Sequence, residues 1–79
     1  MDIKVIGPGC INCQMLEMMV INELARLGVA ANVEKVTDYA EFTKYGVFGT
    51  PGLVINGNLK VAGRVPIADE VRKWIEEEL

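Results

Sequence analysis

The chain has no histidine and only two cysteines among its 79 residues. Histidine is the side chain that most often serves as a general base near neutral pH, and it is also the commonest metal ligand. Its absence narrows both the catalytic mechanisms and the metal sites that the sequence supports. A structural zinc site needs four ligands, so the two cysteines could complete one only with a second copy of the chain.

Long hydrophobic runs and basic clusters are also missing. No apolar run approaches the roughly 18 to 20 residues of a membrane-spanning helix, and the N-terminus MDIKVIGPG lacks the features of a secretory signal. The net charge is −3, with eight Lys and Arg against eleven Asp and Glu, whereas a nucleic-acid-binding protein normally has a basic face. We therefore expect a cytoplasmic protein with no membrane or nucleic-acid partner.

The residues that are present favour a small folded domain. Hydrophobic residues make up 51% of the chain and charged residues 24%, with three prolines and no low-complexity segment. We expect one domain over residues 1–79, acting as a monomer. The hydrophobic pattern predicts the order βαβαββα, with strands at 2–6, 29–36, 53–55 and 58–62 and helices at 10–27, 38–46 and 66–78.

This order predicts an α/β fold. A strand, a long helix and a second strand form a right-handed parallel crossover, and Asn56-Gly57 is a strong signal for a tight hairpin. The prediction is a four-stranded mixed sheet with helices on both faces. Pro66 suits the first position of the last helix, and Ile67 begins an apolar stripe that continues through Val71, Trp74 and Ile75.

Cys10 and Cys13 lie three residues apart at the start of the first predicted helix. A disulfide that closes so short a loop stabilises a fold little, so a chemical role is the better interpretation. A cysteine at a helix N-terminus, in a Cys-X-X-Cys motif, can have a pKa lowered to roughly 3.5–7.5. We expect Cys10 to attack a substrate disulfide and Cys13, one turn further in, to resolve the mixed disulfide.

Three further residues are candidates for substrate binding. Gly9 leaves one side of Cys10 open to the backbone of a partner. A proline at the start of a strand can follow a cis peptide bond, which usually marks a tight turn. If the Thr50-Pro51 bond is cis, the backbone of Thr50 turns outward near the sulfurs and can pair with a substrate peptide as an added strand.

Taken together, these features resemble the thioredoxin superfamily, and in particular its small archaeal and bacterial redox-active disulfide proteins. The resemblance covers the whole chain and rests on Gly-Pro-Gly-Cys-Ile-Asn-Cys at 7–13, Gly-Thr-Pro-Gly-Leu-Val-Ile-Asn-Gly at 49–57, and Gly63. It implies a thioredoxin-like fold, with Cys10 as nucleophile, Cys13 as resolving cysteine and Pro51 as a cis-proline facing them. It also implies disulfide-containing client proteins, a reductase or glutathione as electron donor, and no cofactor beyond the Cys10–Cys13 disulfide.

The sequence departs from the thioredoxin pattern at the motif itself. Thioredoxins proper have Trp before the first cysteine and Gly-Pro between the two, where this chain has Gly9 and Ile11-Asn12. They also carry a buried Asp on the preceding strand, and the corresponding position here is Lys4, so that role is unfilled or falls to water. Lys44 and Arg64 are the only nearby candidates for binding glutathione, and both also suit solvated surface.

Two other interpretations remain open. A soft-metal carrier could hold Cu(I) with the two thiolates, although copper-chaperone domains end in a strand and this chain is predicted to end in a helix. The cysteines could also be incidental to an inert fold.

Overall fold

The computed structural model describes residues 1–79. Its elements, in chain order, are β1 (Asp2–Ile6), α1 (Ile11–Leu27), β2 (Asn32–Val36), α2 (Tyr39–Phe42), the 3₁₀ helix η1 (Thr43–Tyr45), β3 (Gly52–Ile55), β4 (Asn58–Ala62) and α3 (Ala68–Glu77).

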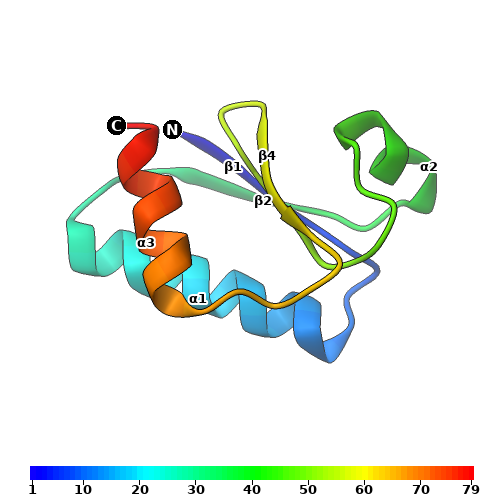
Figure 1. Ribbon diagram of the computed structural model, residues 1–79, viewed down its shortest axis with the longest axis horizontal. Coiled ribbons are helices and arrows are strands. Elements are labelled where there is room, and N and C mark those ends of the chain that lie inside the picture. Colours follow the sequence, from blue (N-terminus) through cyan, green and yellow to red (C-terminus); the bar gives the residue numbers. More distant parts are fainter.

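The strands form one mixed sheet in the order β2-β1-β3-β4. β1 and β2 run parallel and are joined by α1, whereas β3 is antiparallel to both β1 and β4. Helices α1 and α3 lie together on one side of the sheet, and α2 lies beyond its other side (Figure 1). The predicted four-stranded mixed sheet with helices on both faces is confirmed.

Two hydrophobic clusters hold these layers together. The larger cluster joins α1 and α3 to the sheet through ten buried residues: Ile3, Val5, Leu16, Val20, Leu24, Leu53, Ile55, Val61, Val71 and Ile75. The smaller cluster joins α2 and the following loop to the other face through Ile6, Val36, Phe42, Val47 and Val54. Trp74 is partly buried against the larger cluster. β1, at the centre of the sheet, therefore contributes to both clusters, and α1 begins just beyond its end.

The helix predicted at 38–46 consists of α2 followed by η1, and two other boundaries differ from the prediction by more than one residue. The strand predicted at 29–36 begins only at Asn32. Gly28 adopts a left-handed conformation and Val29 N–H donates to Leu24 C=O at 3.0 Å, so these two residues cap the end of α1 instead of joining the strand. The last helix begins at Ala68 rather than Pro66, since Ile67 is extended and acts as its N-cap. Ile67 is 63% exposed and does not belong to the buried stripe. No helix in the structure combines the length and the apolar character needed to span a membrane.

Candidate active site

The two cysteines lie where β1 gives way to α1. Cys10 is the N-cap residue of α1 and has extended backbone angles, while Cys13 lies in the first turn of the helix. Their Cα atoms are 5.0 Å apart and their sulfurs are joined in a disulfide. The loop before them turns at Gly9, whose φ of +89° favours glycine. The predicted position of the pair at a helix N-terminus is therefore the observed one.

The two sulfurs have different surroundings. Cys10 is partly exposed, whereas Cys13 is only 5% exposed. The backbone N–H of Cys13 donates to Sγ of Cys10 at 3.2 Å, so Cys10 receives one of the N–H groups that a helix leaves unpaired at its start. Such a donor and the positive end of the helix dipole both stabilise a thiolate at this position. The more exposed of the two cysteines is thus the one that caps the N-terminus of the helix.

Gly7 packs directly against Cys13. A Cβ at position 7 would overlap Sγ of Cys13, and it would lie 3.3 Å from the cysteine's own Cβ and 3.7 Å from Cβ of Thr50. In the sequence, Gly7 is notable only as the first residue of the motif Gly-Pro-Gly-Cys-Ile-Asn-Cys at 7–13. Its φ is not positive, so the requirement for glycine comes from the space that Cys13 occupies.

The segment around Thr50 and Pro51 approaches the same place. The peptide bond between them is cis, and Pro51 is buried while Thr50 is partly exposed. Gly63 N–H donates to Pro51 C=O at 3.0 Å, and a Cβ on Gly49 would lie 3.4 Å from Cα of Gly63. Two glycines thus allow the chain after β4 to pack tightly against this turn. The structure brings Thr50 next to Gly7 and, through it, next to the cysteines.

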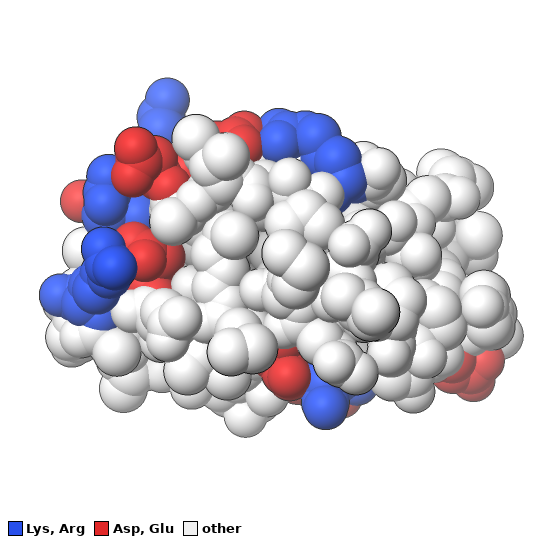
Figure 2. All heavy atoms as spheres, turned by 90° about the horizontal axis from the view of Figure 1, so that it is seen from below, with Lys and Arg blue, Asp and Glu red and all other residues white.

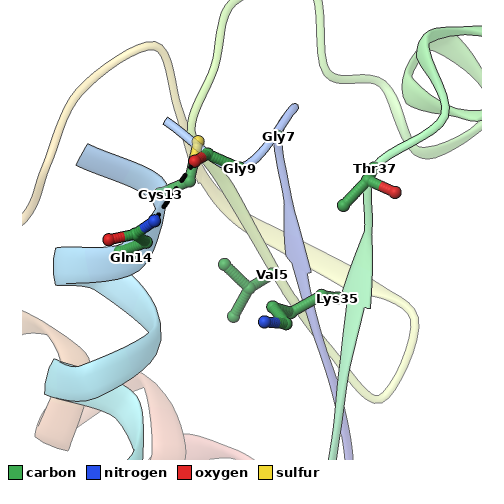
Figure 3. Close-up of a pocket in the computed structure, with 7 residues that line it drawn as sticks. All are labelled: Val5, Gly7, Gly9, Cys13, Gln14, Lys35 and Thr37. Carbon is green, nitrogen blue, oxygen red and sulfur yellow. Dashed lines mark hydrogen bonds between the residues drawn. The ribbon is translucent and has the colours of Figure 1, made fainter. Parts of the chain in front are cut away.

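A small cavity of about 80 Å³ extends from Cys13 between α1 and the sheet. Figure 3 shows the residues that line it: Val5, Gly7, Gly9, Cys13, Gln14, Lys35 and Thr37. Lys35 and Thr37 were not among the residues predicted from the sequence. They come from the end of β2 and the loop after it, and only the parallel pairing of β2 with β1 brings them close to the cysteines.

The two cations considered for glutathione are both occupied. Arg64 donates two hydrogen bonds to the carboxylate of Glu70, at 3.0 and 2.7 Å, and this carboxylate raises the pKa of the guanidinium. Lys44 pairs with Glu41 at 3.0 Å, which raises the pKa of the ammonium. Neither cation is free to bind a carboxylate of a small ligand without giving up its present partner.

Apolar side chains are exposed between the two cysteines and in the loop before Thr50. Ile11, directly after Cys10, is 76% exposed, and Phe48, two residues before Thr50, is 86% exposed. Figure 2 views the molecule from the side of α1 and shows charged side chains gathered at one end and along the edges, with a broad uncharged area between them. This surface is suited to contact with an apolar partner surface.

Comparison with known proteins agrees with this geometry. Residues 1–76 match the family model of the thioredoxin domain. The chain is 38% identical to a thioredoxin of Methanothermobacter thermautotrophicus over 73 residues, which cover 92% of this chain and 95% of that one. It is 30% identical to a thioredoxin of Methanocaldococcus jannaschii over 77 residues, which cover 98% of this chain and 88% of the relative. With nearly its whole length matched in each comparison, the chain belongs to the thioredoxin family and is a protein-disulfide oxidoreductase.

Proposed function

We propose that this chain reduces disulfides of client proteins, with Cys10 as the attacking cysteine and Cys13 as the resolving one. The observation that supports these roles best is the difference between the sulfurs. Cys10 is accessible and accepts the N–H of Cys13, while Cys13 is buried one turn further into α1. A client sulfur can reach the first and not the second.

The reaction takes place in two exchanges. The reduced protein has a thiolate at Cys10, which attacks one sulfur of a client disulfide, and the other client sulfur leaves as a thiolate. Cys13, having lost its proton, then attacks Sγ of Cys10. The bond between Cys10 and the client breaks, the client leaves as its second thiolate, and the Cys10–Cys13 disulfide forms. The client gains two electrons and its two thiolates take up protons, while the cysteine pair is oxidised.

The client backbone is proposed to dock along Gly9, Thr50 and Pro51. Gly9 is exposed and has no side chain to cover Cys10. Thr50 lies beside Gly7, and the Thr50–Pro51 bond is cis. The backbone N–H and C=O of Thr50 would then pair with an extended client segment as an added strand.

A protein reductase is proposed as the electron donor rather than glutathione. Glutathione carries two carboxylates, and a site for it needs unpaired cations near the nucleophile. Lys44 and Arg64 are paired with Glu41 and Glu70, and the face seen from the side of α1 has a broad uncharged area (Figure 2). A protein partner with an apolar contact surface suits this face better. We propose that this exchange takes place in the cytoplasm.

Insulin reduction by the purified chain, with dithiothreitol as electron source, tests the function. Cys10→Ser is expected to abolish turnover. Cys13→Ser is expected to retain the first exchange and accumulate covalent complexes with clients, seen as bands that disappear under reducing conditions. If Cys10→Ser forms the complexes and Cys13→Ser does not, the proposed roles are reversed. If the chain retains stoichiometric Cu(I) and reduces no insulin, the copper-carrier alternative replaces this function.

A further inference from the structure

An open groove runs along α1 on the side that faces the start of α3, separate from the cavity beside Cys13. It has a volume of about 360 Å³, and its lining combines methionines with one carboxylate: Met15, Met18, Met19, Asn22, Glu23, Arg26 and Ala68. Neither cysteine lines it. The exchange chemistry proposed above uses none of these residues.

The methionines of the groove continue an exposed apolar stripe that begins between the cysteines. Ile11, Met15 and Met18 are each at least 50% exposed, and their spacing of four and then three residues places them on one face of the helix. Figure 2 views the molecule from this side and shows its broad uncharged area. Methionine side chains are unbranched and polarizable, so they adapt to partners of different shape. The stripe is therefore suited to contact with another protein.

Glu23 gives this apolar groove an unmet hydrogen-bond acceptor. Its side chain is only 2% exposed, and its oxygen Oε1 is buried without a hydrogen bond. Nε of Arg26 lies 3.4 Å from Oε2, and Nη1 of Arg72 lies 3.8 Å from Oε1, which is too far for a hydrogen bond. Because a buried acceptor without a donor is costly, the groove favours a ligand that brings a donor to Oε1.

The charges around Glu23 balance, so a further cation meets no net repulsion there. Arg72 donates to Asp69 at 2.9 Å, and the two guanidinium groups of Arg26 and Arg72 thus stand against two carboxylates. The chain as a whole has a net charge of −3, which attracts basic partners. A donor that reaches Oε1 as a cation forms a charge-assisted hydrogen bond, which is stronger than a neutral one.

A lysine side chain matches both parts of the groove. Its aliphatic stem can lie along the methionines, and its ammonium is a compact donor. The planar fork of an arginine pairs best with both oxygens of a carboxylate, and Oε2 of Glu23 already faces Arg26. Because methionine side chains have several rotatable bonds, those lining the groove can move aside and open a path to Oε1.

We propose that this groove is a docking site for a protein partner that inserts a lysine side chain between α1 and α3, with its stem against the methionines and its ammonium hydrogen-bonded to Oε1 of Glu23. Met15 follows Cys13 by two residues on α1, so a partner anchored here lies beside the cysteines. The groove thus selects partners that carry a lysine at a suitable place on their surface. The inference does not depend on the roles proposed for the two cysteines.

The test uses the oxidised chain, labelled at its methionine methyl groups, and two capped peptides. One is acetyl-Leu-Lys-Leu-amide, and the other has norleucine in place of lysine, which keeps the stem and lacks the ammonium. In an NMR titration the lysine peptide is expected to shift the methyl signals of Met15, Met18 and Met19. It is also expected to bind about fivefold more tightly than the norleucine peptide, the effect of one net hydrogen bond. In Glu23→Gln the two peptides are expected to bind about equally, because the charge-assisted bond is lost.

Two matched controls separate the groove from the rest of the surface. Glu76→Gln removes an exposed carboxylate of α3 outside the groove, and it should retain the preference for lysine. Met18→Ser is expected to weaken binding of the lysine peptide several-fold. Ile21→Ser, at an exposed apolar residue of α1 that does not line the groove, should leave it unchanged. The comparison of Met18→Ser with Ile21→Ser carries the test if Glu23→Gln does not fold.

Equal binding of the two peptides by the unaltered chain, or the same loss of preference in Glu76→Gln, overturns the inference. A change of the methyl signals with chain concentration alone also overturns it, because the groove would then be an interface between two copies of the chain. The peptides contain no sulfur and the chain stays oxidised throughout. The outcome is therefore independent of the insulin assay that tests the proposed function.

Discussion

Gly7 lies so close to Cys13 that the sulfur of Cys13 occupies the space where a side chain at position 7 would begin. The turn into α1 and the packing of the buried cysteine therefore depend on the same residue. Because the neighbour is an atom of the disulfide itself, a larger residue at position 7 has to displace the sulfur of Cys13 or the end of β1.

We predict that Gly7→Ala lowers the free energy of unfolding by about 1–3 kcal/mol, the usual cost of inserting a methyl group into a packed site. It is also expected to change the reduction potential of the Cys10–Cys13 pair. Urea denaturation of the oxidised and reduced chains and equilibration with a redox buffer measure both effects. Gly28→Ala is the control, since Gly28 has φ +67° and open space around it, and it should lose stability without a change in potential. An unaltered potential in Gly7→Ala would contradict the prediction.

The exposed apolar residues Ile11 and Phe48 are expected to contact clients. We predict that Ile11→Ser and Phe48→Ser each raise KM for insulin by about tenfold, since losing the contact of one such side chain removes about 1.4 kcal/mol. Thermal stability should be little affected, because both side chains are largely exposed. Reaction with a small disulfide such as dithionitrobenzoate should also stay unchanged. Leu79→Ser, at another exposed apolar residue, is the control, and an equal rise in KM there would contradict a specific docking role.

Glu70 makes stability depend on pH in the acid range. Its carboxylate binds Arg64 and accepts the backbone N–H of Ile67 at 3.1 Å, and these bonds lower its pKa from 4.5 to about 2. A carboxyl group whose pKa is lower in the folded chain stabilises it above the unfolded pKa, and this contribution is lost as the pH falls through the folded pKa. The contribution of Glu70 is therefore complete above about 4.5 and disappears towards about 2.

We predict that Glu70→Gln lowers Tm at pH 7 and flattens its dependence on pH between about 4.5 and 2. Thermal denaturation at a series of pH values measures both. Glu76→Gln removes the same charge from the same helix at a residue with no ion pair. The Tm of this variant should depend on pH in the same way as that of the unaltered chain. If the two variants behave alike, the Arg64–Glu70 pair does not supply this stability.

Local signals predicted much of the fold. Asn56 and Gly57 both have positive φ, at 51° and 83°, as the tight hairpin between β3 and β4 requires. The helix predicted at 10–27 ends as predicted at Leu27, and Gly28 after it adopts the left-handed conformation that glycine favours. These outcomes depend on the backbone preferences of one or two residues, so they can be inferred without knowledge of tertiary contacts.

The predicted bounds of β2 and α3 were wrong because the hydrophobic pattern of each element extends beyond the residues that form it. Ile67 has the spacing of the buried stripe of α3. As the N-cap residue, however, it has extended rather than helical backbone angles, and its side chain is exposed to solvent. Val29 and its neighbours are apolar enough for a strand, but they are occupied by the hydrogen bond that completes the end of α1. Hydrophobic spacing alone does not distinguish these cases.

The sequence predicted those residues of the candidate site that are close to one another in the chain. Cys10, Cys13 and Gly9 are neighbours in the chain. A cis bond at Thr50–Pro51 could be suggested because Pro51 stands directly before a predicted strand. Lys35 could not be found this way, because its position beside the cavity depends on the register of β2 against β1. The tight contact between Gly7 and Cys13 likewise depends on three-dimensional packing.

The side chain of Asn56 joins the two ends of the chain: it accepts the backbone N–H of Asp2 at 2.9 Å and donates to the C=O of Glu78 at 3.5 Å. Figure 1 shows the N- and C-termini side by side, at the opposite end of the molecule from the start of α1. If a linker at Met1 or Leu79 attached the chain to a support, the cysteines would therefore lie at the end of the molecule away from that support. The molecule is suited to being tethered, for example to an electrode or a solid support, with its reactive sulfurs still open to arriving proteins.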